Sequence, residues 1–207
     1  MNEKLNQLAV LLRARDDLDA RIAALTGRSA RPGDVGEFIA AQVFDIELAD
    51  TAVQAGYDGI FRSGPLAGRT VNVKIYGDAF TGIDIGPHRC DYYLVLSGPP
   101  RPLGAVRHHR WQISAVYLFD TLRLLETLTA RGVKIGIATS IRKADLEAAQ
   151  IFPATKPNAP IRLTAEQAAL LSLFAEDTHR RLQRPSATTG KGGASSRTGS
   201  SPGDSPA

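Results

Sequence analysis

Cysteine, methionine and tryptophan each occur once in this chain of 207 residues, and histidine occurs four times. The single cysteine, Cys90, cannot form an intrachain disulfide and cannot supply a zinc site built from several cysteines. Apolar runs reach only a few residues, as in Tyr92 to Leu96, far below the roughly 20 residues of a membrane helix. The opening residues Met-Asn-Glu-Lys-Leu lack the apolar core of a signal peptide, so we expect a cytoplasmic protein.

Hydrophobic residues nevertheless make up 43% of the chain and charged residues 22%, so the chain can build a core and is not disordered as a whole. The formal net charge of +4 is compatible with a nucleic-acid partner but does not indicate one. Residues 184–207 are almost entirely Ser, Gly, Thr, Pro and Ala, a composition that predicts a disordered tail.

Residues 1–27 contain few helix breakers and predict one helix over residues 3–26. A stripe of side chains recurs along it at alternating spacings of four and three, as in a short coiled coil. The stripe consists of Lys4, Leu8, Leu11, Arg15, Leu18, Ile22 and Leu25. It either packs on the rest of the chain or forms the seam of a homodimer, and the sequence leaves both interpretations open.

Residues 33–152 are predicted to form an α/β core. Its first helix is expected to start at Asp34, because Glu37 three residues later completes a pattern that resembles a capping box. Residues 57–61 and 69–76 then predict two strands of a hairpin with a long connection.

The rest of the core is predicted from shorter patterns. We expect a central strand at 92–96, a short strand at 111–113, and then a helix capped by Ser114 whose inward residues span 116–128. A strand at 133–138 and a short helix from Ser140 to Gln150 complete the core. Beyond the core we expect a C-terminal helix over 161–183, with a capping box of Thr164 and Gln167.

The second hairpin strand alternates, with Val71 and Val73 on one face and Asn72 and Lys74 on the other. Cleavage of a phosphodiester needs an attacking water and stabilisation of charge on the phosphate. Divalent cations held by carboxylate and carbonyl oxygens supply both. We therefore predict the carboxylate of Asp58 and the carbonyl of Val73 as metal ligands. Lys74 would orient the water or offset phosphate charge.

Glu37, on the first core helix, would complete this shell or accept a hydrogen bond from a bound water. The order helix-strand-strand-strand-helix-strand over roughly residues 33–140, with Glu37, Asp58 and the segment Asn72 to Lys74 within it, resembles the PD-(D/E)XK nuclease superfamily, which has a restriction-endonuclease-like fold. The resemblance implies Mg²⁺-dependent hydrolysis of DNA. It also implies that a strand aspartate and an acid two residues before a lysine hold the metal, sometimes with a helix glutamate.

Asn72 departs from that pattern, because the family expects an acid or sometimes a glutamine at this position. A neutral amide is a weaker oxygen ligand, so metal affinity should fall unless another acid substitutes. Asp84 is the first candidate for that role, and Asp45 or Glu47 the second. The segments Gly56 to Gly59, Asn72 to Lys74 and Val133 to Thr139 are also similar to a bacterial domain family of unknown function.

Each site residue also has an ordinary structural interpretation: Glu37 as part of a helix cap, Asp58 as a turn residue, and Lys74 as a solvated side chain of a strand. We therefore carry two hypotheses from the sequence. The first is a Mg²⁺-dependent nuclease acting on DNA, with Glu37, Asp58, Asn72 and Lys74 at its site. The alternative is a catalytically inactive domain of the same kind that binds nucleic acid or protein and dimerises through its N-terminal helix.

Overall fold

A computed structural model describes residues 2–49, 56–86, 90–105, 111–153 and 160–175. The chain divides into two units, residues 1–176 and 177–207, and every described residue belongs to the first. No helix in these ranges is both long enough and apolar enough to cross a membrane.

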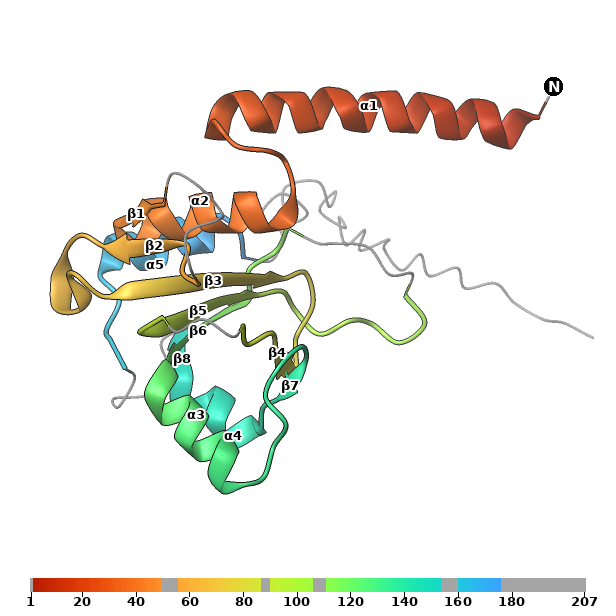
Figure 1. Cartoon of the computed structure of the whole chain (residues 1–207). Helices are drawn as coiled ribbons and strands as arrows, with labels where there is room; N and C mark the ends of the chain where they lie inside the picture. Colours follow the sequence, from red (N-terminus) through yellow and green to blue (C-terminus); the bar gives the residue numbers. More distant parts are fainter. Residues whose placement is uncertain (1, 50–55, 87–89, 106–110, 154–159, 176–207) are drawn as a thin grey trace, which may run out of the picture. The chain divides into compact units, whose positions relative to one another are not determined.

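Helices and strands are mixed along the described chain (Figure 1). The helices are α1 (Glu3–Thr26), α2 (Pro32–Phe44), α3 (Thr121–Ala130), α4 (Lys143–Ala149) and α5 (Ala165–Ser172), with a 3₁₀ turn η1 (Gly64–Leu66). The strands are β1 (Ile46–Leu48), β2 (Gly59–Phe61), β3 (Thr70–Tyr76), β4 (Gly82–Ile83), β5 (Tyr92–Ser97), β6 (Ala115–Asp120), β7 (Thr139–Ser140) and β8 (Gln150–Phe152).

Six of the strands form a mixed sheet in the order β1-β2-β3-β5-β6-β8, and β4 pairs with β7 in a small separate hairpin. β3 and β5 are parallel, whereas the other neighbours in the sheet are antiparallel. β5 lies between β3 and β6, and its side chains from Leu94 to Leu96 are fully buried. This confirms the prediction of a central strand at 92–96.

The sheet is covered on both faces (Figure 1). On one face α2 and α5 pack over a core that contains Ile39, Val71 and Leu171. On the other face α3 and α4 cover a second core, with Leu124 and Phe119 among its buried residues. The α/β class predicted from the sequence is therefore confirmed.

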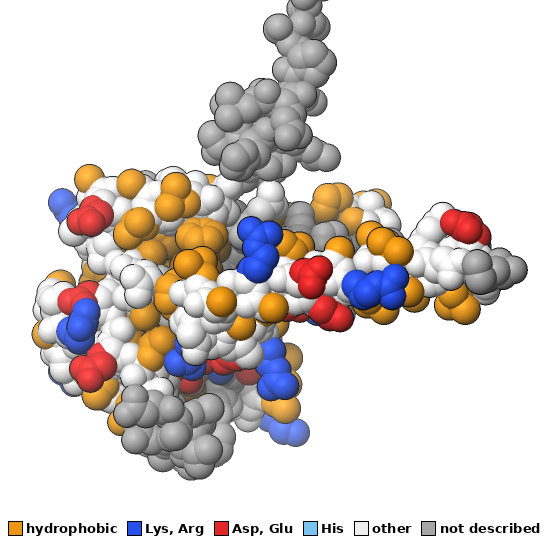
Figure 2. Space-filling model, turned by 90° about the horizontal axis from the view of Figure 1, so that it is seen from above, with side chains coloured by type: hydrophobic (Ala, Val, Ile, Leu, Met, Phe, Trp, Pro, Cys, Tyr) orange, Lys and Arg blue, Asp and Glu red, His pale blue; other side chains and the backbone are white. Residues whose placement is uncertain are grey.

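α1 follows its predicted bounds and ends at Gly27, whose φ of 68° is a left-handed conformation that glycine adopts at no steric cost. None of its 24 residues is buried. Figure 2 shows hydrophobic side chains interspersed with charged ones along the visible face of this helix.

The hairpin and its alternation are also confirmed. β2 pairs antiparallel with β3, with Gly59 opposite Val71. Val71 and Val73 are buried in the core under α2, while Asn72 and Lys74 occupy the other set of alternating positions. The capping box of Thr164 and Gln167 opens α5 as predicted, but α5 ends at Ser172, and residues 176–183 of the predicted helix lie outside the described residues.

The helix predicted after Ser114 is wrong in its first part, because residues 115–120 form β6. The apolar residues at three- and four-residue spacings belong to two different elements. Val116 is buried in the strand β6. The helix α3 begins only at Thr121 and is capped by the Asp120 carboxylate. As a result α3 buries Leu124, and Leu122, predicted to face inward, is exposed. The predicted short strand at 111–113 does not form.

The predicted strand at 133–138 is also wrong, since only Thr139 and Ser140 pair, with β4. Ile137 is 92% exposed, so no apolar face is buried there. The helix expected to start at Ser140 is α4, which is capped by Arg142 instead, and the edge strand β8 follows it.

Candidate functional site

Asp58 lies where β2 and β3 separate. The two strands pair only at Gly59–Val71 and Ile60–Thr70, whereas β3 continues to Tyr76. Beyond the last pair, the Asp58 carboxylate takes the place of a strand and accepts a hydrogen bond from the Val73 N–H at 2.7 Å. The carboxylate is thus fixed against the middle of β3 at the point where the strands separate.

The backbone of Asp58 is held as firmly as its side chain. Its N–H donates to the Val71 carbonyl at 2.8 Å, and its carbonyl accepts from the Ala49 N–H at 2.9 Å. Gly59 beside it has no room for a side chain, because a Cβ there would lie 2.5 Å from the Glu47 carbonyl oxygen. The close approach of β1 and β2 therefore requires glycine next to the site aspartate.

Asn72 and Lys74 share one set of alternating positions on β3, as the sequence predicts. The side-chain Oδ1 of Asn72 is buried and accepts no hydrogen bond from the described residues. A buried amide oxygen without a donor is energetically costly, and such exceptions in folded proteins call for an explanation such as a bound ion or water. Asn72 therefore presents an acceptor suited to a ligand that binds oxygen.

Glu37 lies on α2, which packs on the Val71 and Val73 face of β3, whereas Asn72 and Lys74 occupy the other set of positions on that strand. The contact between helix and strand depends on Gly36, where a Cβ would lie 2.9 Å from Ile75 Cβ and Cγ2. The capping box predicted for Glu37 is wrong: α2 begins at Pro32, because proline fits the first helical position, and Arg31 is the N-cap. The Glu37 carboxylate instead accepts from Arg28 Nη2 at 2.5 Å.

The charges of the three elements are coupled. Burial raises the pKa of Glu37 and the nearby Asp58 carboxylate raises it further, while Arg28 and Lys74 act in the opposite direction. Burial likewise raises the pKa of Asp58 against the lowering effects of the Val73 N–H, Lys74 and Arg28. The charge of Lys74 thus acts on both carboxylates, and the charge of Asp58 acts on Glu37.

Besides Arg28, Cys90 and Tyr93 interact with the site although the sequence did not assign them to it. Burial raises the pKa of the Cys90 thiol, and the charge of Asp58 raises it further. Burial raises the pKa of Tyr93 to about 12, with smaller contributions from Cys90 and Asp58 among others. Tyr93 is the register partner of Asn72 on β5, a parallel pairing that no local pattern predicts.

The replacement acids considered for Asn72 are engaged elsewhere. The Asp84 carboxylate accepts from the Ala138 N–H at 2.7 Å and joins the loop before β7 to β4. Asp45 forms an ion pair with Arg62 on the exposed surface, and Glu47 is exposed on β1. None of the three contributes to the pKa shifts of Glu37 and Asp58.

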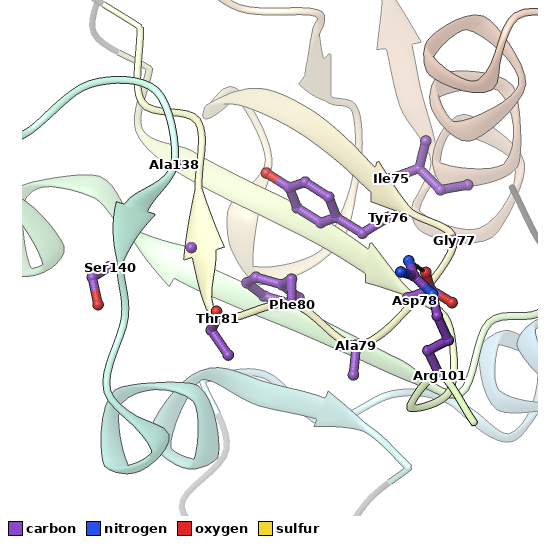
Figure 3. Close-up of a pocket in the computed structure, with 11 residues that line it drawn as sticks. Ile75, Tyr76, Gly77, Asp78, Ala79, Phe80, Thr81, Arg101, Ala138 and Ser140 are labelled. Atoms are coloured by element: carbon purple, nitrogen blue, oxygen red, sulfur yellow. Dashed lines mark hydrogen bonds and ion pairs between the residues drawn. The ribbon is translucent and has the colours of Figure 1, made fainter. Parts of the chain in front are cut away.

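A pocket of about 740 Å³ opens beyond the end of β3, but Glu37, Asp58, Asn72 and Lys74 do not line it. Figure 3 shows the ring of Tyr76 next to that of Phe80, and their centroids are 5.0 Å apart in a stacked arrangement. At the other end Arg101 and Asp78 form an ion pair. Lys74 directly precedes the first lining residue, Ile75, but successive residues of a strand point to opposite faces.

The donors of the proposed site fit a divalent cation in kind: two coupled carboxylates and one amide oxygen that has no partner among the described residues. It is poorer in charge than a site with three acids, and the described ranges contain no group of three or more His, Cys, Asp or Glu side chains able to hold a metal ion. Asp58 and Asn72 would hold the ion, with Glu37 completing the shell once it is free of Arg28. The Val73 residue contacts Asp58 through its amide, and the metal-binding role of its carbonyl stays a prediction.

Comparison with models of known protein families gives no match for this chain, and comparison with curated proteins gives none either.

Proposed function

We propose that this chain is a Mg²⁺-dependent nuclease that hydrolyses DNA, with a core of the restriction-endonuclease-like kind. One observation carries the proposal: the Glu37 carboxylate is electrostatically coupled to Asp58 and Lys74 from separate elements, and Asn72, two residues before Lys74 on β3, has a buried Oδ1 with no partner among the described residues. Buried carboxylates with raised pKa values next to a cation are typical of functional sites.

Each side chain of the site would have a role that follows from its charge and its hydrogen bonds. Asp58 would bind the cation with the carboxylate oxygen that Val73 does not engage, and Asn72 would add its amide oxygen. The bound Mg²⁺ would supply an activated water and neutralise charge on the scissile phosphate. Lys74 would place a positive charge against a phosphate oxygen or orient the attacking water. Glu37 would accept a hydrogen bond from that water.

The strand arrangement supports the proposal in part. A helix precedes the hairpin, β3 pairs in parallel with the next sheet strand, β5, and the strand separation places a carboxylate beside β3. The second half of the core departs from the expected order of elements, because β6 precedes α3 and the strand expected at 133–138 does not form. The cytoplasmic location expected from the sequence remains a prediction.

Cleavage of supercoiled plasmid DNA in the presence of Mg²⁺ or Mn²⁺ tests the proposal. We expect nicking by the wild-type chain and a loss of about 100-fold or more in Lys74→Met and Asp58→Asn, the size of effect seen when a charge-stabilising group is removed. Lys143→Met is the matched control, because Lys143 lies exposed on α4. A wild-type chain without metal-dependent cleavage, or Lys74→Met with full activity, would overturn the proposal.

The alternative function is a catalytically inactive module that binds nucleic acid or protein. Two observations favour it: Asn72 stands where an acid is expected, and Arg28 already neutralises Glu37 at 2.5 Å. Asn72→Asp distinguishes the two functions. In a nuclease it should increase an activity that the wild type already has. In an inactive module the wild type does not cleave, and binding to DNA should persist in Lys74→Met.

A further inference from the structure

α1 exposes more apolar surface than a helix in water ordinarily retains. None of its residues is buried, and Leu8, Leu11, Leu18 and Leu25 are 49–80% exposed. Helices in proteins gain most of their stability from packing an apolar face, so a helix of 24 residues with this composition needs a surface to pack on. The described part of the chain provides none, because no residue of α1 is buried by it.

The apolar residues of α1 form a coiled-coil seam. Leu8, Leu11, Leu18, Ile22 and Leu25 occupy alternating spacings of three and four, and Arg15 is the one charged residue among them. The seam runs over about 26 Å from Leu8 to Leu25, at 1.5 Å per residue. Leu5 and Leu12 widen the same stripe, whereas Val10 lies off it.

The charges of α1 divide into two halves of opposite sign. The N-terminal half carries Lys4, Arg13 and Arg15 against Glu3, and the C-terminal half carries Asp16, Asp17 and Asp19 against Arg21. A parallel pair would bring like halves together and would place Arg15 opposite Arg15 of the second copy. An antiparallel pair places the basic half of each helix against the acidic half of the other.

We propose that α1 pairs antiparallel with α1 of a second copy of this chain. In the register that aligns the two seams end to end, Leu8 faces Leu25 of the second copy and Leu11 faces its Ile22. Arg15 then faces Leu18 of the second copy, next to the acidic residues of that half. A polar residue within such a seam fixes register and orientation at a cost in affinity. This pairing is independent of the nuclease proposal.

Sedimentation of the full-length chain tests the pairing. We expect twice the chain mass for the wild type and for Val10→Asp. For Leu11→Asp we expect the mass of one chain at the same concentration, with association weakened by about 100-fold or more, because the carboxylate would be buried in the seam. Val10 and Leu11 are adjacent and similarly exposed, at 58% and 66%, so only the face of the helix differs. The unfolding midpoint of the core should stay unchanged in both variants.

Mixed disulfides test the orientation. In a Cys90→Ala background, oxidation of a mixture of Leu8→Cys and Leu25→Cys chains should give the heterodisulfide in several-fold excess over either homodisulfide. Predominant homodisulfides would overturn the antiparallel arrangement. A wild-type chain that sediments as a monomer at every concentration, or that binds anionic lipid vesicles through α1 instead, would overturn the proposal as a whole, whatever the outcome of the nuclease assay.

Discussion

In most proteins apolar side chains are buried and charged ones are exposed, and two successive helices of this chain depart from that rule in opposite ways. α1 leaves a stripe of leucines in water, whereas α2 carries the charged side chain of Glu37 toward a partly buried region beside Asp58. Around Glu37, α2 is otherwise ordinary: Ile39, Ala40 and Val43 are buried in the core against β3. The two helices therefore lack different things: α1 lacks an apolar surface to pack on, and the carboxylates near α2 lack a full countercharge.

The exposed leucines and the coupled carboxylates indicate different partners. Exposed leucines in a heptad seam need another apolar helix, since burial of apolar surface is the main driving force of association. Coupled carboxylates with raised pKa values need a cation, since burial has removed the water that would otherwise stabilise their charge. Arg28, in the connection between the two helices, supplies part of that cationic charge.

The largest expected effect contrasts the two helices directly. Ile39→Ala should lower the free energy of unfolding by about 2–5 kcal/mol, because the side chain is buried and its loss leaves a cavity. Leu18→Ala, at a residue 54% exposed, should change it by less than about 0.5 kcal/mol in dilute solution where the chain is monomeric. Urea unfolding measures both. Equal losses would show that α1 packs on the core.

The next effect concerns the contact that brings Glu37 to β3. Gly36→Ala should destabilise the fold by about 1–3 kcal/mol, because its Cβ would approach Ile75 to 2.9 Å. Gly33→Ala in the same helix meets no atom within 4 Å and is the matched control. It should be neutral or stabilising by up to about 1 kcal/mol. A harmless Gly36→Ala would mean that α2 is not tightly packed on β3.

A smaller effect is the dependence of stability on pH. The folded-state pKa values of Glu37 and Asp58 are raised above their ordinary 4.5 and 3.8. Folding thus favours the protonated acids, and their contribution to stability is complete below these values and is lost as pH rises through the raised ones. Mn²⁺ should therefore raise the Tm of the wild type near pH 7 and leave it unchanged near pH 4. Asp58→Asn should remove the shift, and a shift that is retained in this variant would place the ion elsewhere.

The smallest effect concerns Arg28. Replacing it in Arg28→Gln frees the Glu37 carboxylate from its ion pair, so affinity for Mn²⁺ should rise by about 2- to 10-fold in calorimetric titration. Arg31→Gln is the control, because Arg31 is an exposed residue of the same connection. Weaker binding in Arg28→Gln would indicate that the guanidinium supports the site instead of competing for it.

How far the sequence predicts the structure differs along the chain. Strict alternation on β3 fixes the faces of Asn72 and Lys74, because a strand has a period of two whatever its neighbours are. Over residues 115–130 the same reasoning fails, because a strand and a helix follow each other without a break and their apolar residues mimic one helical stripe. A local pattern cannot distinguish these cases without the pairing partner of the strand.

The candidate site shows the same limit. Glu37, Asp58 and Lys74 are each recognisable from the sequence by residue type and spacing, and their coupling follows from how α2 and the hairpin pack. Arg28 and Tyr93 were not predictable, because Arg28 reaches Glu37 through the irregular connection between α1 and α2, and Tyr93 pairs with Asn72 through a parallel strand contact distant in sequence. Long-range contacts of this kind leave no periodic signal in the chain.

The most direct test of the central claim is a crystal structure of the full-length protein grown with Mn²⁺. We expect an anomalous peak that contacts the Asp58 carboxylate and Asn72 Oδ1 at roughly 2.0–2.4 Å, the range for oxygen ligands of such cations. We also expect that Glu37 has turned away from Arg28. A structure with no peak near Asp58, in which Asn72 Oδ1 accepts a hydrogen bond from the protein, would contradict the account.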